Sequence, residues 1–212
     1  MHFRCDGMLL ELASFRHHRC IGSPPLSAPN LYVCLFKVLY IFVVIQHASR
    51  RILHFNVTAH PTADWTLQQL REAIGFNGGY RFLLHDRDRI FANHLDDSVR
   101  CLGLDILKSP VHSPNANAIC ERVIGTIRRE CLDWMIPLSQ THLRSILKTW
   151  DEHYNKGRPH SFLGPGIPDP PGRLELADRP ELRHRLDGNT SVRVKSVLGG
   201  LHHEYSLEPL RG

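Results

Sequence analysis

Hydrophobic and polar positions along the chain follow two different periods, which predicts a mixed α/β fold. Strands are predicted where apolar and β-branched residues cluster or alternate, at residues 38–45, 51–58, 81–85 and 105–107. Helices are predicted where apolar residues recur every three to four positions, near residues 62–74, 95–102, 117–134 and 139–154. The order strand, strand, helix, strand, helix, strand, helix, helix is typical of a single α/β core.

The two ends of the chain lack this periodicity. Residues 1–29 are rich in His, Arg, Pro and Ser, and we expect them to be poorly ordered and to lie outside the core. The core is predicted over residues 30–164. Residues 165–212 are expected to form a Pro/Gly-rich linker and an irregular C-terminal tail, with a small β-hairpin around Gly199 and Gly200.

Charge changes this picture in one respect. The formal net charge is +5, and the residues before Asp64 hold six Lys or Arg but only two acids, Asp6 and Glu11. No acid lies between Glu11 and Asp64. Arg outnumbers Lys by 21 to 5. Arginine pairs well with phosphate, so this bias fits a nucleic-acid partner, although a GC-rich genome explains it equally well.

Cysteine usage and hydropathy indicate the compartment. The six cysteines are dispersed without a CxxC pair, which is typical of reduced thiols in a cytoplasmic protein. Residues 1–15 lack the apolar run of a secretory signal. The most apolar stretch, residues 31–45, is interrupted by Lys37 and is too short for a membrane span, so no membrane association is expected.

Two acids have a context that suggests chemistry. Asp86 ends a strand of buried character, and Glu121 lies on the helix that follows residue 117. A strand-end carboxylate and a helix carboxylate can bind one divalent cation, and hard oxygen ligands suit Mg²⁺ or Mn²⁺. Gly125 and Arg128 share the helix face of Glu121, which would leave room for a phosphate. From spacing alone, an ordinary solvated surface is the favoured interpretation of both acids.

Three motifs decide between these interpretations. The segments HDRDRIF (85–91), SPNANAICERVIGTIRRECLD (113–133) and HYNKGRPHSFLG (153–164) resemble the integrase catalytic core of bacterial insertion-sequence transposases. These proteins are relatives of retroviral integrases with a ribonuclease-H-like fold, in which a mixed sheet is flanked by helices. The resemblance runs from about Lys37 to Gly164, which is about 60% of the chain.

The resemblance implies a DDE recombinase, in which three carboxylates bind two Mg²⁺ ions for DNA nicking and strand transfer. Asp86 matches the second carboxylate, with Asp88 as the alternative, and Glu121 matches the last. The loop residues Asn115 and Asn117 match positions that contact DNA. The basic residues expected to hold the phosphate backbone are Arg122, Arg128, Arg129, Lys148 and Arg158. Multimers on DNA are also implied.

The motif that follows the last core helix leaves two alternatives open. Residues 154–160, which include Tyr154, Asn155 and His160, match a family pattern at this place. A DNA contact and a packing element that ends the helix are equally compatible with these residue types.

The first carboxylate of the family has no counterpart where we expect it. The window of residues 27–30 reads Ser-Ala-Pro-Asn, and an amide such as Asn30 supplies no negative charge for two metals. Residues 30–35 are apolar enough to fill the central position of the sheet without a catalytic acid. Asp6 and Glu11 would need an insertion to reach the site. We therefore predict an integrase core that is inactive in catalysis.

Two further alternatives follow from this prediction. The chain could be a DNA-binding remnant without catalysis, or the non-functional product of a disrupted gene. Residues 1–29 do not resemble the family, which fits a frameshift upstream of Lys37.

Overall fold

The computed structural model describes residues 7–21, 33–75, 79–85, 93–108, 118–164, 166–170 and 189–209. The chain divides into two compact units, residues 1–145 and 146–212, and the division falls inside one helix.

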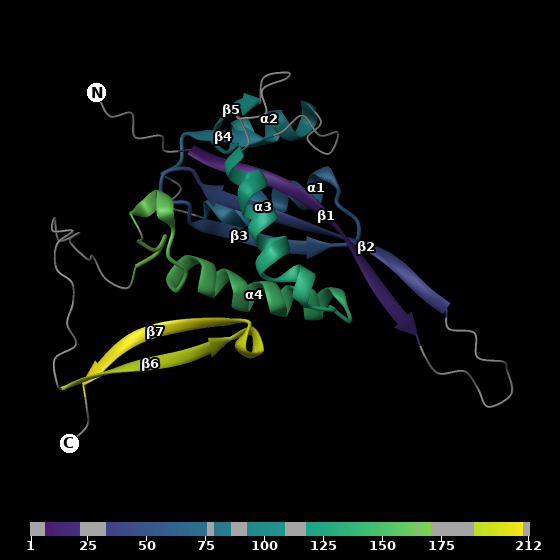
Figure 1. The fold of residues 1–212 in the computed structure, drawn as a ribbon. Coiled ribbons are helices and arrows are strands. Elements are labelled where there is room, and N and C mark those ends of the chain that lie inside the picture. Colours follow the sequence, from purple (N-terminus) through teal and green to yellow (C-terminus); the bar gives the residue numbers. More distant parts are fainter. Residues whose placement is uncertain are drawn as a thin grey trace, which may run out of the picture. The chain divides into compact units, whose positions relative to one another are not determined.

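Helices and strands follow the predicted order, with one additional strand at the start (Figure 1). The strands are β1 (Gly7–Ile21), β2 (Val33–Gln46), β3 (Ile52–Thr58), β4 (Phe82–His85), β5 (Asp105–Lys108), β6 (Thr190–Val197) and β7 (His202–Pro209). The α-helices are α1 (Ala63–Ile74), α2 (Asn93–Cys101), α3 (Ala118–Glu130) and α4 (Gln140–Lys156). Three short 3-10 turns cover Leu132–Trp134, Ser161–Leu163 and Leu198–Gly200.

The first unit is built on a five-stranded sheet with the order β3-β2-β1-β4-β5. β1, β2 and β3 are antiparallel neighbours, whereas β4 pairs with β1 and β5 in parallel. β1 is therefore the central strand. Its parallel register with β4 begins with Gly7 opposite Phe82 and ends with Leu10 opposite His85.

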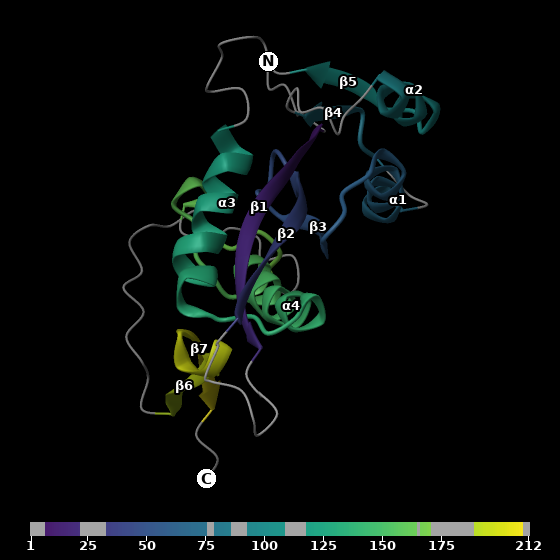
Figure 2. The ribbon, with the colours of Figure 1, turned by 90° about the vertical axis from the view of Figure 1, so that its right-hand side faces the viewer.

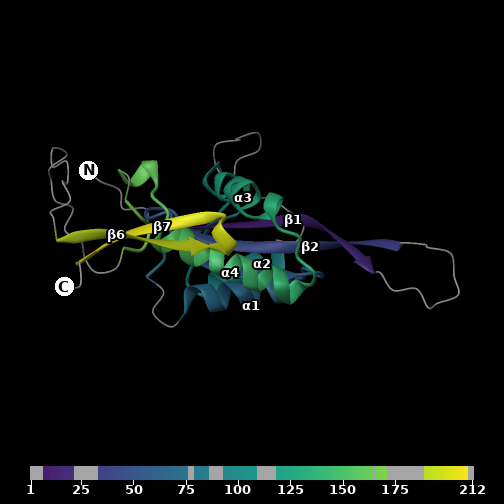
Figure 3. The same cartoon turned by 60° about the horizontal axis from the view of Figure 1, so that its bottom comes forward.

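Helices cover both faces of this sheet. α1 lies on one face and α3 on the other, with α3 packed against β1 (Figures 2 and 3). α2 packs against α1 and β5. The core beneath α1 and α2 consists of buried apolar side chains from sheet and helices: Phe42, Val44, Leu67, Leu70, Leu83, Leu95, Val99 and Leu104. This layered arrangement agrees with the predicted α/β class.

Local sequence signals explain where α1 begins and α2 ends. The Thr62 hydroxyl accepts a hydrogen bond from the Trp65 amide at 3.2 Å, which is the predicted N-cap of α1. Gly103, just beyond α2, has φ +82°. This left-handed conformation favours glycine, as the predicted end of that helix requires.

Three expectations about the elements were wrong. Residues 30–35 do not fill the centre of the sheet, because Val33 already begins β2 and β1 takes the central place. Residues 7–21 form a strand, although they show no clear alternation, because backbone pairing on both sides can override weak propensity. α3 ends at Glu130, and the 3-10 turn Leu132–Trp134 follows it. The predicted boundaries at residues 29 and 164 stay predictions.

In the second unit, β6 and β7 form the predicted antiparallel hairpin. Gly199 and Gly200, both with positive φ, make its turn. Among the described residues, no helix is long and apolar enough to cross a membrane.

Candidate metal and nucleic-acid site

The predicted site residues fall into three groups. Asp86, Asn115 and Asn117 lie outside the described residues. Glu121 is exposed in the first turn of α3 and Arg122 directly after it, and Arg128 and Arg129 are exposed in its last turn. Lys148 is exposed on α4 in the second unit, and Arg158 follows that helix.

We predicted that Gly125 would leave room for a phosphate on the face of α3 that carries Glu121. The structure shows a different arrangement. The Arg129 guanidinium fills the space beside Gly125, and a Cβ added there would meet its Nη1 at 3.0 Å. The glycine therefore accommodates a side chain of its own helix. Arg129 is further tied to its surroundings because its carbonyl accepts a hydrogen bond from the Trp134 indole at 2.8 Å.

The backbone register brings an acid to the level where β4 ends. The last paired residues of β1 and β4 are Leu10 and His85. Glu11 follows Leu10 within β1, and Asp86 is the next residue in the sequence after His85. α3, which carries Glu121, packs against the same strand β1. Sequence reasoning discounted Glu11 because it assumed a shorter distance between the first and second strands of the sheet.

The donor types fit a divalent cation. Carboxylate oxygens are the ligands that Mg²⁺ and Mn²⁺ prefer. β1 carries Glu11, α3 carries Glu121, and Asp86 follows β4 in the sequence. Within the described part of the chain, which omits Asp86, no group of three or more His, Cys, Asp or Glu side chains lies within reach of one metal.

Sequence reasoning also missed a buried pair beside this place. His85 Nε2 lies 3.1 Å from Asp96 Oδ1, and both side chains are almost completely buried. A histidine at the end of an apolar strand and an aspartate in an amphipathic helix were visible in the sequence. Their separation of 11 residues gave no signal that they meet.

The motif after α4 is mostly buried within the second unit. Tyr154 and His160 pack edge to face at 4.5 Å, and the His160 ring lies 3.2 Å from the Tyr154 carbonyl. The Asn155 carbonyl accepts a hydrogen bond from the Asp169 amide at 2.8 Å. The Arg158 guanidinium lies 5.9 Å above the Tyr154 ring. These contacts favour the packing alternative for this motif.

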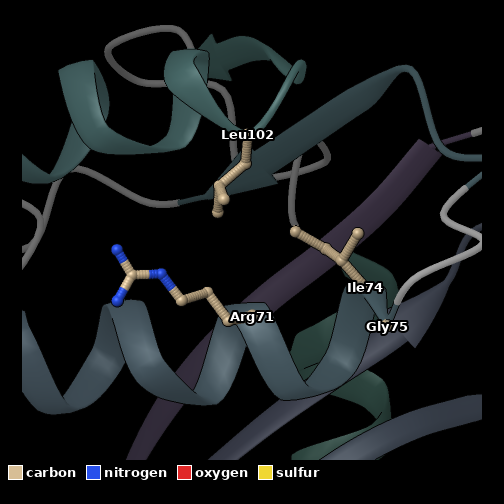
Figure 4. Close-up of a pocket in the computed structure, with 4 residues that line it drawn as sticks. All are labelled: Arg71, Ile74, Gly75 and Leu102. Carbon is tan, nitrogen blue, oxygen red and sulfur yellow. The ribbon is translucent and has the colours of Figure 1, made fainter.

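A separate cavity of about 290 Å³ lies at the end of α1 in the first unit. Arg71, Ile74, Gly75 and Leu102 line it, with Leu102 facing the last turns of α1 (Figure 4). None of the predicted site residues lines this cavity.

Comparison with protein families gives the decisive observation. Residues 102–168 match the integrase core domain family, and this segment contains Glu121 and the motif after α4. Residues 102–168 are therefore similar to an integrase core. The match includes α3 and α4, so this similarity rests on the part of the chain with the most specific motifs.

Curated relatives agree with the integrase core. The putative transposase InsD for insertion element IS2E of Escherichia coli K12 is 36% identical over 74 residues, which are 34% of this chain and 34% of that protein. Transposase InsD for insertion element IS2A/D/F/H/I/K of Escherichia coli is 36% identical over 74 residues, or 24% of its length. The matched segment thus spans about a third or less of these relatives.

Solved structures support the fold over a longer part of the chain. The catalytic core domain of BIV integrase covers 77% of this chain and 91% of its own, with TM-score 0.51 and 13% identity. The HTLV-2 integrase catalytic core domain in complex with magnesium, in a dimeric form, covers 76% and 92%, with TM-score 0.54 and 10% identity. The predicted ribonuclease-H-like α/β fold is confirmed.

A third solved structure matches nearly the whole chain. The simian T-cell lymphotropic virus intasome in complex with PP2A regulatory subunit B56 gamma covers 96% of this chain and 66% of its own, with TM-score 0.57 and 13% identity. At this identity the likeness concerns the fold alone.

Proposed function

We propose that this chain is the integrase core of a transposable element, that it binds DNA, and that it uses a divalent cation held by Glu11, Asp86 and Glu121. The observation that carries the proposal is the integrase-core match over residues 102–168. The insertion-element transposases that match at 36% identity favour a bacterial mobile element over a viral one.

The proposal that Glu11 is a metal ligand departs from the prediction that the core is inactive. That prediction depended on the absence of an acid at residues 27–30, together with an assumed central strand at residues 30–35. The central strand is instead β1, which carries Glu11 directly after the last residue paired with β4. Glutamate is one methylene longer than aspartate, so we expect slower catalysis than three well-placed acids would give. Bound Mg²⁺ or Mn²⁺ would activate water, and then a DNA 3′-hydroxyl, as the attacking group.

The remaining predicted site residues are proposed to bind the DNA. Arg122, Arg128 and Arg129 present exposed guanidinium groups along α3, the helix that carries Glu121. Guanidinium groups bind phosphate oxygens in a bidentate manner and would hold the backbone beside the reacting phosphodiester. Asn115 and Asn117 precede this helix and are proposed to contact DNA near the metal. Lys148 and Arg158 are proposed phosphate contacts of the second unit.

Assembly of several copies on DNA is part of the same proposal. Its support is that one similar structure is an intasome and another is a dimeric catalytic core.

The test is a nicking assay on supercoiled plasmid with Mg²⁺ or Mn²⁺. We expect cleavage by the unaltered chain and its loss in Glu11→Gln, Asp86→Asn and Glu121→Gln. Glu130→Gln on the same helix is the matched control that should keep it, and loss of cleavage in Asp88→Asn but not in Asp86→Asn would assign the second carboxylate to Asp88. Cleavage that survives Glu11→Gln but not Asp86→Asn would remove Glu11 from the site. Absence of cleavage by the unaltered chain with either metal would restore the prediction of an inactive core.

A further inference from the structure

A polar pair is buried beside the apolar cluster between the sheet and α2. His85 is the last residue of β4, and its Nε2 lies 3.1 Å from Oδ1 of Asp96 on α2. The His85 side chain is 3% exposed and that of Asp96 4%. Leu83 and Leu95, two residues before His85 and one before Asp96, belong to the apolar cluster between the sheet and α2.

Stability alone does not account for such a pair. Transferring a histidine and a carboxylate from water into the interior carries a desolvation cost, and apolar residues of similar size are often at least as stable. What a hydrogen-bonded pair supplies is a defined geometry, because the two side chains can meet in few orientations. The pair therefore fixes β4 and α2 against each other at this point.

The point that is fixed is the end of β4. Backbone pairing to Leu10 and Lys108 holds His85 within the sheet. The contact with Asp96 adds a restraint perpendicular to the sheet, from the face covered by α1 and α2. α3 lies on the opposite face (Figure 3). Since successive residues of a strand face opposite sides, the contact of His85 with Asp96 fixes the orientation of the last residue of β4.

We propose that Asp96 is a positioning residue that acts through His85 to fix the end of β4, and with it the carboxylate of Asp86. The proposal rests on the proposed function, since Asp86 is a metal ligand only there. Metal ligands depend on such supporting contacts, whose loss typically weakens metal affinity by about 10- to 100-fold.

The experiment measures Mn²⁺ affinity of the full chain without DNA, by electron paramagnetic resonance or calorimetry, at a temperature where every variant is folded. Asp96→Leu removes the contact, and we expect a loss of affinity of about 10-fold or more. Asp96→Asn keeps an oxygen that accepts a hydrogen bond from His85, so it should restore most of the affinity. Should Asp96→Leu fail to fold, Asp96→Glu, which displaces the carboxylate by one methylene, takes its place with the same expectation.

Two controls distinguish a role in positioning the end of β4 from a general loss of protein stability. Asp97→Leu removes the neighbouring exposed carboxylate, which pairs with Arg100 at 2.7 Å, and should leave the affinity unchanged. Leu95→Ala creates a cavity in the same helix but keeps the His85–Asp96 pair, so it should lower the unfolding temperature without lowering the affinity.

The outcomes separate the two proposals. If the unaltered chain binds Mn²⁺ and Asp96→Leu binds it equally well, the positioning role is overturned and the metal site stands. Equal losses in Leu95→Ala and Asp96→Leu would overturn it as well. If the unaltered chain does not bind Mn²⁺ at all, the metal site of the proposed function fails and the positioning role fails with it.

Discussion

Glu204 on β7 contacts two basic side chains in the second unit. Its carboxylate lies 2.9 Å from His153 Nδ1 and accepts a hydrogen bond from Lys195 Nζ at 3.1 Å. The His153 ring in turn stacks on His202, with centroids 4.9 Å apart. These contacts join the hairpin to the end of α4 within one unit.

The close approach of Glu204 to Gly157 leads to a first prediction. A Cβ at residue 157 would occupy the place of the Glu204 carboxylate and displace it from His153. We expect Gly157→Ala to destabilise the folded chain by about 1 kcal/mol, the usual worth of a lost hydrogen bond. Chemical denaturation measures this change. Gly79→Ala is the control, because nothing lies within 4 Å of its Cβ position, and an equal effect there would contradict the explanation.

The pKa of Glu204 gives a pH-dependent prediction. Burial raises this pKa, but the hydrogen bonds from His153 and Lys195 outweigh burial, and the pKa lies below its ordinary value of 4.5. A lowered pKa stabilises the fold above the pKa of the unfolded chain, and this contribution is lost as the pH falls through the folded value. The stability difference between the chain and its Glu204→Gln variant should be constant near neutral pH and shrink below 4.5. A difference that is independent of pH would refute this role.

At the scale of elements, the start of α4 is fixed to β3 by polar contacts. Arg144 donates from Nε to Asn56 Oδ1 at 2.9 Å and from Nη2 to the Val57 carbonyl at 2.8 Å. Gln140 Nε2 donates to the same carbonyl at 2.9 Å. Arg144 thus bridges two elements that are more than 80 residues apart in the sequence.

Removal of this bridge should affect stability and not only charge. We expect Arg144→Ala to cost about 1 to 3 kcal/mol, because the partly buried Asn56 Oδ1 and Val57 carbonyl lose a donor. Urea unfolding measures the loss. Lys148→Ala, at an exposed position one turn further along α4, should change stability by less than about 0.5 kcal/mol. Similar effects of both substitutions would show that helix propensity, and not the bridge, is responsible.

Most helices and strands were predictable because the signals for each one, such as the spacing of apolar residues, a cap or a turn, lie within its own short stretch of sequence. α1 has its cap and its apolar face within 13 residues, and the β6–β7 hairpin has two glycines at its turn. β1 was not predictable, because its place in the sheet is determined by pairing with β2 and β4, and β4 begins 61 residues after β1 ends. The same long-range pairing brought Glu11 to the end of β4, so the candidate site was only partly predictable.

At the scale of the whole molecule, charge distribution predicts how DNA binding responds to salt. Each phosphate contact by Lys or Arg releases about one counterion, so the logarithm of the affinity falls linearly with the logarithm of salt concentration. We expect Arg128→Ala and Arg129→Ala each to reduce the slope by about 1.

Arg100→Ala on α2 is the control for these two substitutions, because Arg100 already pairs with Asp97. Fluorescence anisotropy with a labelled duplex at several salt concentrations gives the slopes. An affinity that does not change with salt would exclude backbone binding by these residues.

The strand order of the first unit also has a consequence for synthesis on the ribosome. β1, β2 and β3 are consecutive antiparallel neighbours, so they can pair as soon as residue 58 has emerged. The other edge of β1 then has no sheet neighbour until residues 82–85 follow, and an open edge invites pairing with another chain. The nascent chain is therefore most prone to aggregate between these two points, and α1, which emerges in this interval and packs on β3, is the first element that can cover the exposed sheet.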